Sequence, residues 1–320
     1  MATAEQIKAL IRSHFGEDQE MFFTVALQVA AQEAQQGHGA LAHDIRDIVE
    51  NARRENRTKL SRVPNDLLDL LLPEDTYVPK SALVVPSALL NRIERIIHEF
   101  RQQHILKSYG LFHRRKIMLI GPPGTGKTMT SRILAHELRL PFYSVQVDKL
   151  VTKFMGETSA KLRLIFEQIQ KNQGVYLFDE FDAIGGARTL DNDVGEMRRV
   201  LNSFLQFIEH NTSDSLIIAA SNSPRLLDAA LFRRFDDVLH YTEPEVEDRR
   251  KLIRNILGEF YSNNFIWKKV LKESKGLSHA EIAQVCRDAI KKAILNNMKT
   301  VSTELLLQMI GERRATHKRL

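Results

Sequence analysis

A glycine-rich segment between an apolar run and a helical stretch places the strongest constraint on the fold of this chain. Residues 121–128 are Gly-Pro-Pro-Gly-Thr-Gly-Lys-Thr, which fits the pattern G-x-x-x-x-G-K-T. The apolar residues 116–120 come directly before it, and residues 129–138 have a helical pattern. A strand, a glycine loop and a helix in this order are typical of a parallel sheet wrapped by helices.

This segment predicts a phosphate-binding loop. Its glycines let backbone N–H groups turn inward around phosphate oxygens, and the following helix directs its positive dipole end to the same place. We expect Lys127 to reach the β- and γ-phosphates of ATP and Thr128 to offer its hydroxyl to Mg²⁺. The predicted nucleotide ligands of the loop are Gly121, Pro122, Pro123, Gly124, Thr125, Gly126, Lys127 and Thr128.

Two adjacent acids follow a second apolar run about fifty residues later. Residues 175–182 are Val-Tyr-Leu-Phe-Asp-Glu-Phe-Asp, so the predicted strand ends in Asp179 and Glu180. The carboxyl edge of a parallel sheet is where ligands bind. We expect Asp179 to bind Mg²⁺ directly or through water, and Glu180 to orient and polarise an attacking water. Together the two motifs predict an enzyme that hydrolyses ATP.

Short apolar runs alternate with helical stretches over the middle of the chain. The predicted strands are residues 116–120, 142–147, 175–178, 215–220 and 237–241. This alternation predicts an α/β fold with a parallel sheet. We place the nucleotide-binding domain at residues 87–245, and a helical lid at residues 246–320 because that region contains no convincing strand.

The N-terminal region has a different pattern. Apolar residues at helical spacing, such as Ile7, Leu10 and Ile11, predict three short helices between residues 5 and 55. Residues 61–86 contain four prolines that interrupt any long helix, which predicts a linker. Residues 1–60 carry no phosphate loop, no paired acids at a strand end and no ligand-like histidine spacing. We therefore expect this small helical domain to recruit a protein substrate or partner.

The net charge of +6 is unevenly distributed. Residues 1–60 hold 7 Lys and Arg against 9 Asp and Glu, whereas residues 266–320 hold 12 against 5. A slightly acidic recruitment domain weighs against nucleic acid as a partner, because nucleic-acid binding depends on neutralising phosphates.

Three features predict a cytoplasmic protein. The apolar runs are too short to span a membrane, the N-terminus lacks a signal layout, and Cys286 is the only cysteine.

With these motifs the chain resembles the AAA+ superfamily over residues 85–310, and most closely its AAA-proper branch of katanin-, spastin- and proteasomal-ATPase-like motors. The resemblance rests on residues 121–128, on 178–182 (Phe-Asp-Glu-Phe-Asp) and on 218–222 (Ile-Ala-Ala-Ser-Asn). It implies a P-loop sheet with a helical lid. The single ATPase module and the compact N-terminal region resemble those of bacterial single-ring AAA proteins. The resemblance also implies that Asn222 lies between the two acids and the γ-phosphate and helps to position the water.

Residues 227–236, Leu-Asp-Ala-Ala-Leu-Phe-Arg-Arg-Phe-Asp, resemble the arginine-finger segment of this family. The resemblance implies that Arg233 and Arg234 reach the γ-phosphate of a neighbouring subunit. Arginine suits this role because its planar fork binds phosphate bidentately and stays charged. Which of the two makes the main contact is left open. The resemblance therefore implies a homo-oligomer, and most often a hexameric ring.

Residues 153–158, Lys-Phe-Met-Gly-Glu-Thr, resemble the first pore loop of the family. The resemblance implies that Lys153, Phe154 and Met155 line a central channel and grip an extended polypeptide. Aromatic and thioether side chains offer contact that tolerates many sequences. The expected function is therefore chaperone-like: hydrolysis of ATP drives remodelling, disassembly or unfolding of a protein.

Two alternatives remain open at this point. One is a nucleic-acid-associated AAA+ loader or motor, which the basic C-terminal region favours. The other is a nucleotide-gated scaffold that regulates a partner enzyme without threading it.

In the lid, residues 276–282 (Gly-Leu-Ser-His-Ala-Glu-Ile) resemble a family motif near the adenosine, but His279 and Glu281 replace the usual glycine and aspartate. The lid sequence lacks the arginine sensor of other AAA+ clades.

Overall fold

The computed structural model describes residues 8, 13, 19–36, 38–39, 41–49, 67–74, 77–150, 157–185, 194–223, 227, 229–262 and 264–317. Contacts along the chain divide it into two units, residues 1–62 and 63–320. Lys153, Phe154 and Met155 of the predicted pore loop lie outside the described residues.

The first unit is mainly helical in its described part. Helix α2 covers Gln19–Gln35, and residues 41–49 are also helical. Ala26 of α2 and Val49 are buried together, and the partly buried Phe22, Leu27 and Ile45 pack against them. These two helices fall where the apolar spacing predicted the second and third helices of this region.

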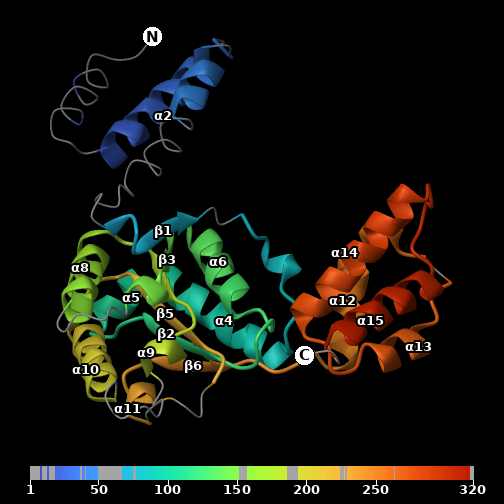
Figure 1. Ribbon diagram of the computed structural model, residues 1–320. Helices are drawn as coiled ribbons and strands as arrows, with labels where there is room; N and C mark the ends of the chain where they lie inside the picture. Colours follow the sequence, from blue (N-terminus) through green and yellow to red (C-terminus); the bar gives the residue numbers. More distant parts are fainter. Residues whose placement is uncertain are drawn as a thin grey trace. The chain divides into compact units, whose positions relative to one another are not determined.

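The second unit is built around one six-stranded sheet with the order β1-β3-β4-β5-β2-β6 (Figure 1). Four of the five strand pairs are parallel and only β1–β3 is antiparallel. This sheet confirms the predicted α/β class. The strands are β1 (Leu71–Glu74), β2 (Lys116–Ile120), β3 (Phe142–Val145), β4 (Val175–Phe178), β5 (Leu216–Ser221) and β6 (Asp237–His240).

Strand β1 falls inside the segment where the sequence predicted a linker. It pairs with β3 at the edge of the sheet, with Leu71 opposite Val145 and Glu74 opposite Phe142. Pro73 is tolerated there because an edge strand has one side without a partner strand. Leu71 has no exposed surface, so this short strand is anchored in the core.

Helices cover both faces of the sheet, and each face has its own core. Residues alternate between the two faces of each strand: in β4, Tyr176 and Phe178 face one cluster, and Val175 and Leu177 face the other. The helices of this part are α4 (Ser87–Arg101), α5 (Gln103–Ser108), α6 (Lys127–Leu138), α7 (Val147–Leu150), α8 (Glu157–Lys171), α9 (Asp182–Gly185), α10 (Val194–His210) and α11 (Ala229–Phe232).

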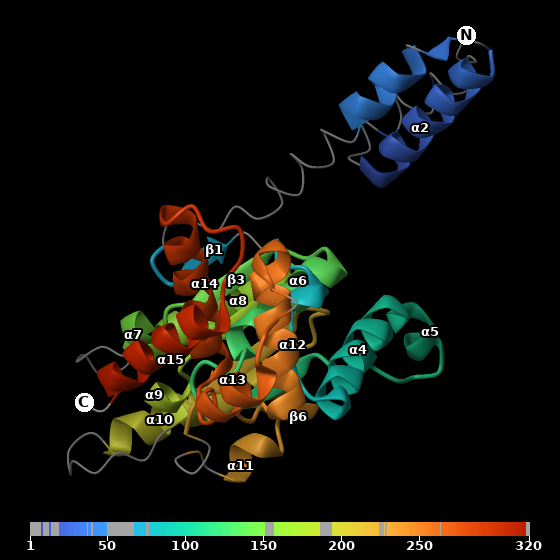
Figure 2. The same ribbon diagram turned by 90° about the vertical axis from the view of Figure 1, so that its right-hand side faces the viewer.

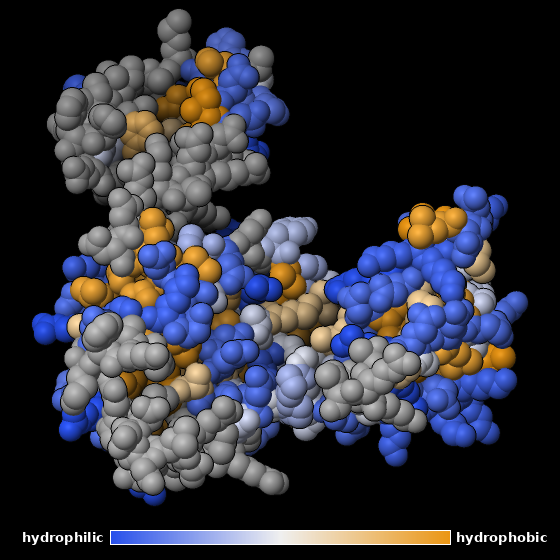
Figure 3. Space-filling view, in the orientation of Figure 1, coloured by the Kyte–Doolittle hydropathy of each residue, from blue (hydrophilic) through white to orange (hydrophobic). Residues whose placement is uncertain are grey.

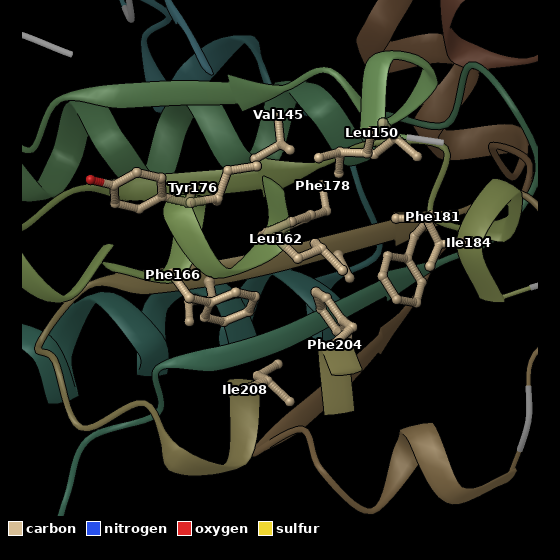
Figure 4. Close-up of a cluster of buried hydrophobic side chains, with 14 of the residues drawn as sticks. Val145, Leu150, Leu162, Phe166, Tyr176, Phe178, Phe181, Ile184, Phe204 and Ile208 are labelled. Atoms are coloured by element: carbon tan, nitrogen blue, oxygen red, sulfur yellow. The ribbon is translucent and has the colours of Figure 1, made fainter. Parts of the chain in front are cut away.

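The core beneath α8 and α10 is rich in aromatic rings (Figure 4). Phe178 lies 5.2 Å from Phe204 of α10 and 6.0 Å from Phe166 of α8, between ring centroids. Phe181, directly after the predicted magnesium ligand Asp179 and the predicted base Glu180, lies 4.6 Å from Phe204. The two acids therefore lie in sequence between two packed aromatic residues, Phe178 and Phe181. These rings fix the end of the strand that the acids follow.

The C-terminal part forms the predicted helical lid (Figure 2). Its core contains Cys286, whose burial raises the thiol pKa to about 12, and the partly buried Trp267 packs against it. Val84, which comes before α4 in the chain, is buried in the same core. Hydrophilic residues cover most of the lid on the side that Figure 3 shows. The lid elements are α12 (Val246–Leu257), the 3-10 helix Gly258–Phe260, α13 (Trp267–Glu273), α14 (His279–Leu295) and α15 (Thr303–His317).

Candidate nucleotide-binding site

The glycine-rich loop joins β2 to α6 at the carboxyl edge of the sheet. Gly121 has a φ of 150°, and a Cβ there would overlap the carbonyl oxygen of Tyr241. Gly124 has a φ of 72°, and its Cβ would lie 2.8 Å from Ser278 Oγ of the lid. Both positions therefore require glycine, the first for the turn and the second for the close approach of the lid.

Lys127 points back across this loop. Its Nζ donates hydrogen bonds to the carbonyl oxygens of Gly121 at 2.7 Å and Pro122 at 2.8 Å, and to Asn222 Oδ1 at 2.8 Å. The residue is only 6% exposed. Burial lowers the pKa of its ammonium, and the charges of Asp179 and Asp182 oppose that shift. The loop therefore holds a desolvated cation, which a phosphate can satisfy strongly.

The predicted magnesium ligands lie together. Thr128 Oγ1 donates to Asp179 Oδ2 at 2.6 Å, joining the start of α6 to the end of β4. Hydroxyl and carboxylate oxygens are suitable ligands for Mg²⁺, which usually takes one or two carboxylates and completes its shell with phosphate oxygens and water. Within the described ranges, no three His, Cys, Asp or Glu side chains cluster as a metal site. The hydroxyl of Thr128 and the carboxylate of Asp179 fit an ion that shares phosphate oxygens of a nucleotide.

Glu180 is exposed beside the buried end of β4. Its φ of 50° is left-handed, which is uncommon for a residue with a side chain. Its N–H donates to Asp179 Oδ1 at 2.9 Å, and the next N–H, of Phe181, donates to the Ala220 carbonyl of β5 at 2.8 Å. This turn lets Glu180 line the same cleft as the loop.

Asn222 follows the neighbouring strand β5. Its backbone N–H donates to Asp182 Oδ1 at 3.1 Å, while its side-chain oxygen accepts from Lys127. Because β4, β5 and β2 are adjacent in the sheet, their carboxyl ends bring three sequence-distant segments to one edge. The structure therefore gathers Lys127, Thr128, Asp179, Glu180 and Asn222 around one cleft.

The lid closes the other side of this cleft, whose volume is about 1030 Å³. The Ala280 N–H donates to the Gly124 carbonyl at 2.9 Å, so the start of α14 is bonded to the loop. Leu83, Leu252 and Ile256 add apolar wall. His279 also lines the cleft, and burial lowers its pKa. Neither ring nitrogen of His279 has a hydrogen-bond partner of good geometry among the described residues. The backbone of Val84 nevertheless favours the protonated ring and partly opposes the lowering of the pKa.

Sequence reasoning missed three arginines that line the cleft, Arg132, Arg287 and Arg313. Arg132 lies four residues after Thr128, one helical turn along α6. Because residues at this spacing share a helix face, the sequence could have predicted Arg132 near the cleft. It is already occupied, because its Nε and Nη2 donate to Glu74 Oε2 at 3.1 and 2.5 Å. Arg287 and Arg313 come from α14 and α15, and only the packing of the lid brings them there.

The predicted finger arginines lie apart from this cleft. Arg233 and Arg234 are exposed just after α11, and neither lines the cleft. Arg234 Nη1 forms an ion pair with Glu209 Oε1 at 2.6 Å. A subunit therefore does not offer either side chain to its own nucleotide site in this structure.

Fold and site together define a P-loop nucleoside-triphosphate-binding domain with a helical lid. Residues 117–242 match the family described as "ATPase family associated with various cellular activities (AAA)". The chain is 33% identical, over all of its length and 99% of the relative, to "Uncharacterized AAA family ATPase y4kL" of Sinorhizobium fredii. The chain belongs to the AAA family of ATPases, and it is an enzyme that binds and hydrolyses ATP.

Other relatives match over a smaller region. The chain is 31% identical to "ATP-dependent zinc metalloprotease FtsH 1" of Sphaerobacter thermophilus, over 61% of the chain and 31% of the relative. It is 34% identical to "ATP-dependent zinc metalloprotease FtsH" of Rickettsia bellii, over 58% of the chain and 30% of the relative. It thus spans about a third of these longer proteins. Among the described residues, none of the helices is long and apolar enough to cross a membrane.

Proposed function

We propose that this ATPase assembles into a ring and uses ATP hydrolysis to remodel, disassemble or unfold a protein substrate. The observation that carries the proposal is that the cleft residues and the predicted finger arginines lie apart on one subunit. Lys127 and Glu180 line the cleft, whereas Arg233 and Arg234 lie exposed outside it. A site that needs an arginine at the γ-phosphate is then completed by a neighbouring copy, with six copies as the expected ring.

Each residue of the cleft has a distinct role in the proposed reaction. Lys127 binds the β- and γ-phosphates, and Thr128 and Asp179 hold Mg²⁺, which neutralises charge on the phosphates when bound. Glu180 accepts a proton from the attacking water. Asn222, fixed by its bonds to Lys127 and Asp182, orients that water. The guanidinium of Arg233 or Arg234 from the neighbour stabilises negative charge in the transition state.

A protein substrate is favoured by the pore-loop pattern at residues 153–158 and by the acidic balance of residues 1–60. The names of the FtsH relatives describe proteases that depend on ATP. This chain has no H-E-x-x-H pattern, the helical zinc-protease motif, so a degradative role would require a separate peptidase. We propose that residues 1–60 recruit the substrate and that Phe154 and Met155 grip it.

The decisive experiment compares Phe154→Ala with Phe154→Tyr, using a substrate captured by the hydrolysis-deficient Glu180→Gln protein. Phe154→Ala should keep ATP affinity and assembly near the parent level but lose substrate processing. Phe154→Tyr should retain most processing, because the contact needs a flat apolar ring. Normal processing by Phe154→Ala would identify a nucleotide-gated scaffold instead. Salt-dependent retention of nucleic acid on a filter, with no captured protein, would favour a nucleic-acid motor.

A further inference from the structure

The last helix of the lid, α15, reaches the nucleotide cleft through Arg313. Its neighbour in sequence, Arg314, is used elsewhere. Arg314 Nη2 donates to the Lys275 carbonyl at 2.8 Å, and Nη1 lies 3.4 Å from Glu273 Oε2 of α13. The two adjacent arginines therefore lie in different environments: Arg314 contacts α13 and Lys275, and of the two only Arg313 lines the cleft.

Arg313 is tied to the phosphate loop by a short series of contacts. Its Nε lies 3.5 Å from Glu281 Oε1 in the first turn of α14. Glu281 Oε2 accepts from the N–H of Ser278 at 2.8 Å and from its hydroxyl at 2.9 Å. The next residues reach the loop directly, since the Ala280 N–H donates to the Gly124 carbonyl. The start of α14 thus contacts both Arg313 and the phosphate loop.

The hydrogen-bonding capacity of Arg313 is largely unused. A guanidinium offers five N–H donors. The 3.5 Å contact with Glu281 lacks hydrogen-bond geometry, and Nε is buried without a hydrogen-bond partner among the residues that the structure describes. Its terminal nitrogens likewise make no hydrogen bond within those residues, and the side chain stays 38% exposed. Arg132, by contrast, is already bound to Glu74.

Two acidic side chains of α14 interact electrostatically with Arg313. Besides its ion pair with Glu281, Arg313 contributes through its charge to the lowered pKa of Asp288, whose main cause is hydrogen bonding from Gln284. The ion pair with Glu281 places the guanidinium at the cleft and leaves its hydrogen-bond donors unused. A planar cation with unused donors, in the cleft that the phosphate loop also lines, is suited to a phosphate oxygen, which it can bind bidentately.

We propose that Arg313 is a nucleotide-binding residue that contacts a phosphate group of ATP and leaves Glu281 when the nucleotide is bound. The C-terminal helix then senses the nucleotide directly. The inference rests on the proposed placement of ATP in this cleft.

The test measures the affinity of the full chain for ATP, ADP, AMP and adenosine by calorimetry. Arg313→Ala should weaken ATP binding on the order of tenfold or more, as expected for loss of a charge-assisted hydrogen bond. Adenosine affinity should stay within about twofold of the parent, because adenosine has no phosphate. Arg313→Lys should lie between parent and Arg313→Ala, since lysine keeps the charge and loses the fork. The matched control Arg314→Ala should bind all four ligands like the parent.

A second variant separates phosphate binding from a purely structural ion pair. Glu281→Gln keeps an acceptor for the helix cap and removes the charge that competes for Arg313. It should bind ATP at least as tightly as the parent. Unchanged ATP affinity in Arg313→Ala, an equal loss for adenosine, or a matching loss in Glu281→Gln would each overturn the proposal. Lys127→Ala tests the cleft itself: if it loses ATP while Arg313→Ala does not, the ATP site stands and the role of Arg313 fails.

Discussion

Replacing Lys127 by methionine should abolish ATP binding without unfolding the protein. Lys127 is nearly buried and donates three hydrogen bonds, to Gly121, Pro122 and Asn222. Methionine loses these bonds but also removes a charge whose burial is unfavourable, as the lowered pKa of Lys127 indicates. A lowered pKa means that the unfolded chain binds this proton more tightly, so burying the charged form costs stability at neutral pH. We expect the two effects to leave a net change of about 1 kcal/mol without nucleotide.

The ligand-dependent part of stability gives the larger signal. A ligand at 100 times its dissociation constant stabilises the folded state by about 2.7 kcal/mol. For a unit of this size, 1 kcal/mol moves the unfolding midpoint by roughly 2–4 °C. The parent should therefore gain about 5–10 °C from saturating Mg-ATP. Lys127→Met should gain none, because the phosphates lose their main cationic partner.

Thermal unfolding with and without Mg-ATP measures both quantities on one sample. Lys116→Met is the matched control: burial also lowers the pKa of Lys116, but this residue begins β2, at the end of the strand away from the loop. It should keep the full ATP-induced shift. A Lys127→Met protein that still gained the parental shift would refute the assignment of Lys127 to the phosphates.

Three further predictions test the reaction, the assembly and the recruitment domain. Glu180→Gln should bind ATP normally but hydrolyse it on the order of 10²-fold more slowly in a phosphate-release assay, since the base is removed; a parental rate would exclude Glu180 as base. Subunits with both Arg233→Ala and Arg234→Ala, inactive alone, should regain ATPase activity when mixed with inactive Lys127→Ala subunits; full activity of a diluted parent monomer would contradict fingers supplied by a neighbour. Deleting residues 1–60 should leave the basal ATPase rate largely intact and abolish work on the captured substrate; loss of basal hydrolysis in an assembled truncation would refute a pure recruitment role.

Local chemistry made most of the α/β architecture predictable. All five predicted strands form, because each is a short apolar run bounded by loop or helix signals, and buried parallel strands need such runs. Strand β1 was missed for an equally local reason. Its sequence, Leu-Leu-Pro-Glu, contains a proline that argues against a strand, and only its edge position beside β3 makes that residue acceptable.

The candidate site likewise has one part that the sequence predicts and another that only the tertiary structure shows. The sequence by itself determined the loop at residues 121–128 and the acids at 179 and 180, because a phosphate loop and a strand-end carboxylate pair need fixed residue types at fixed spacing. Only the tertiary structure decided which lid side chains face the cleft. Arg313 lies 185 residues after Thr128 along the chain, and no local pattern distinguishes it from Arg314. Packing of α15 against α14 directs Arg313 to the cleft and Arg314 to Glu273, because neighbouring residues on a helix point in different directions.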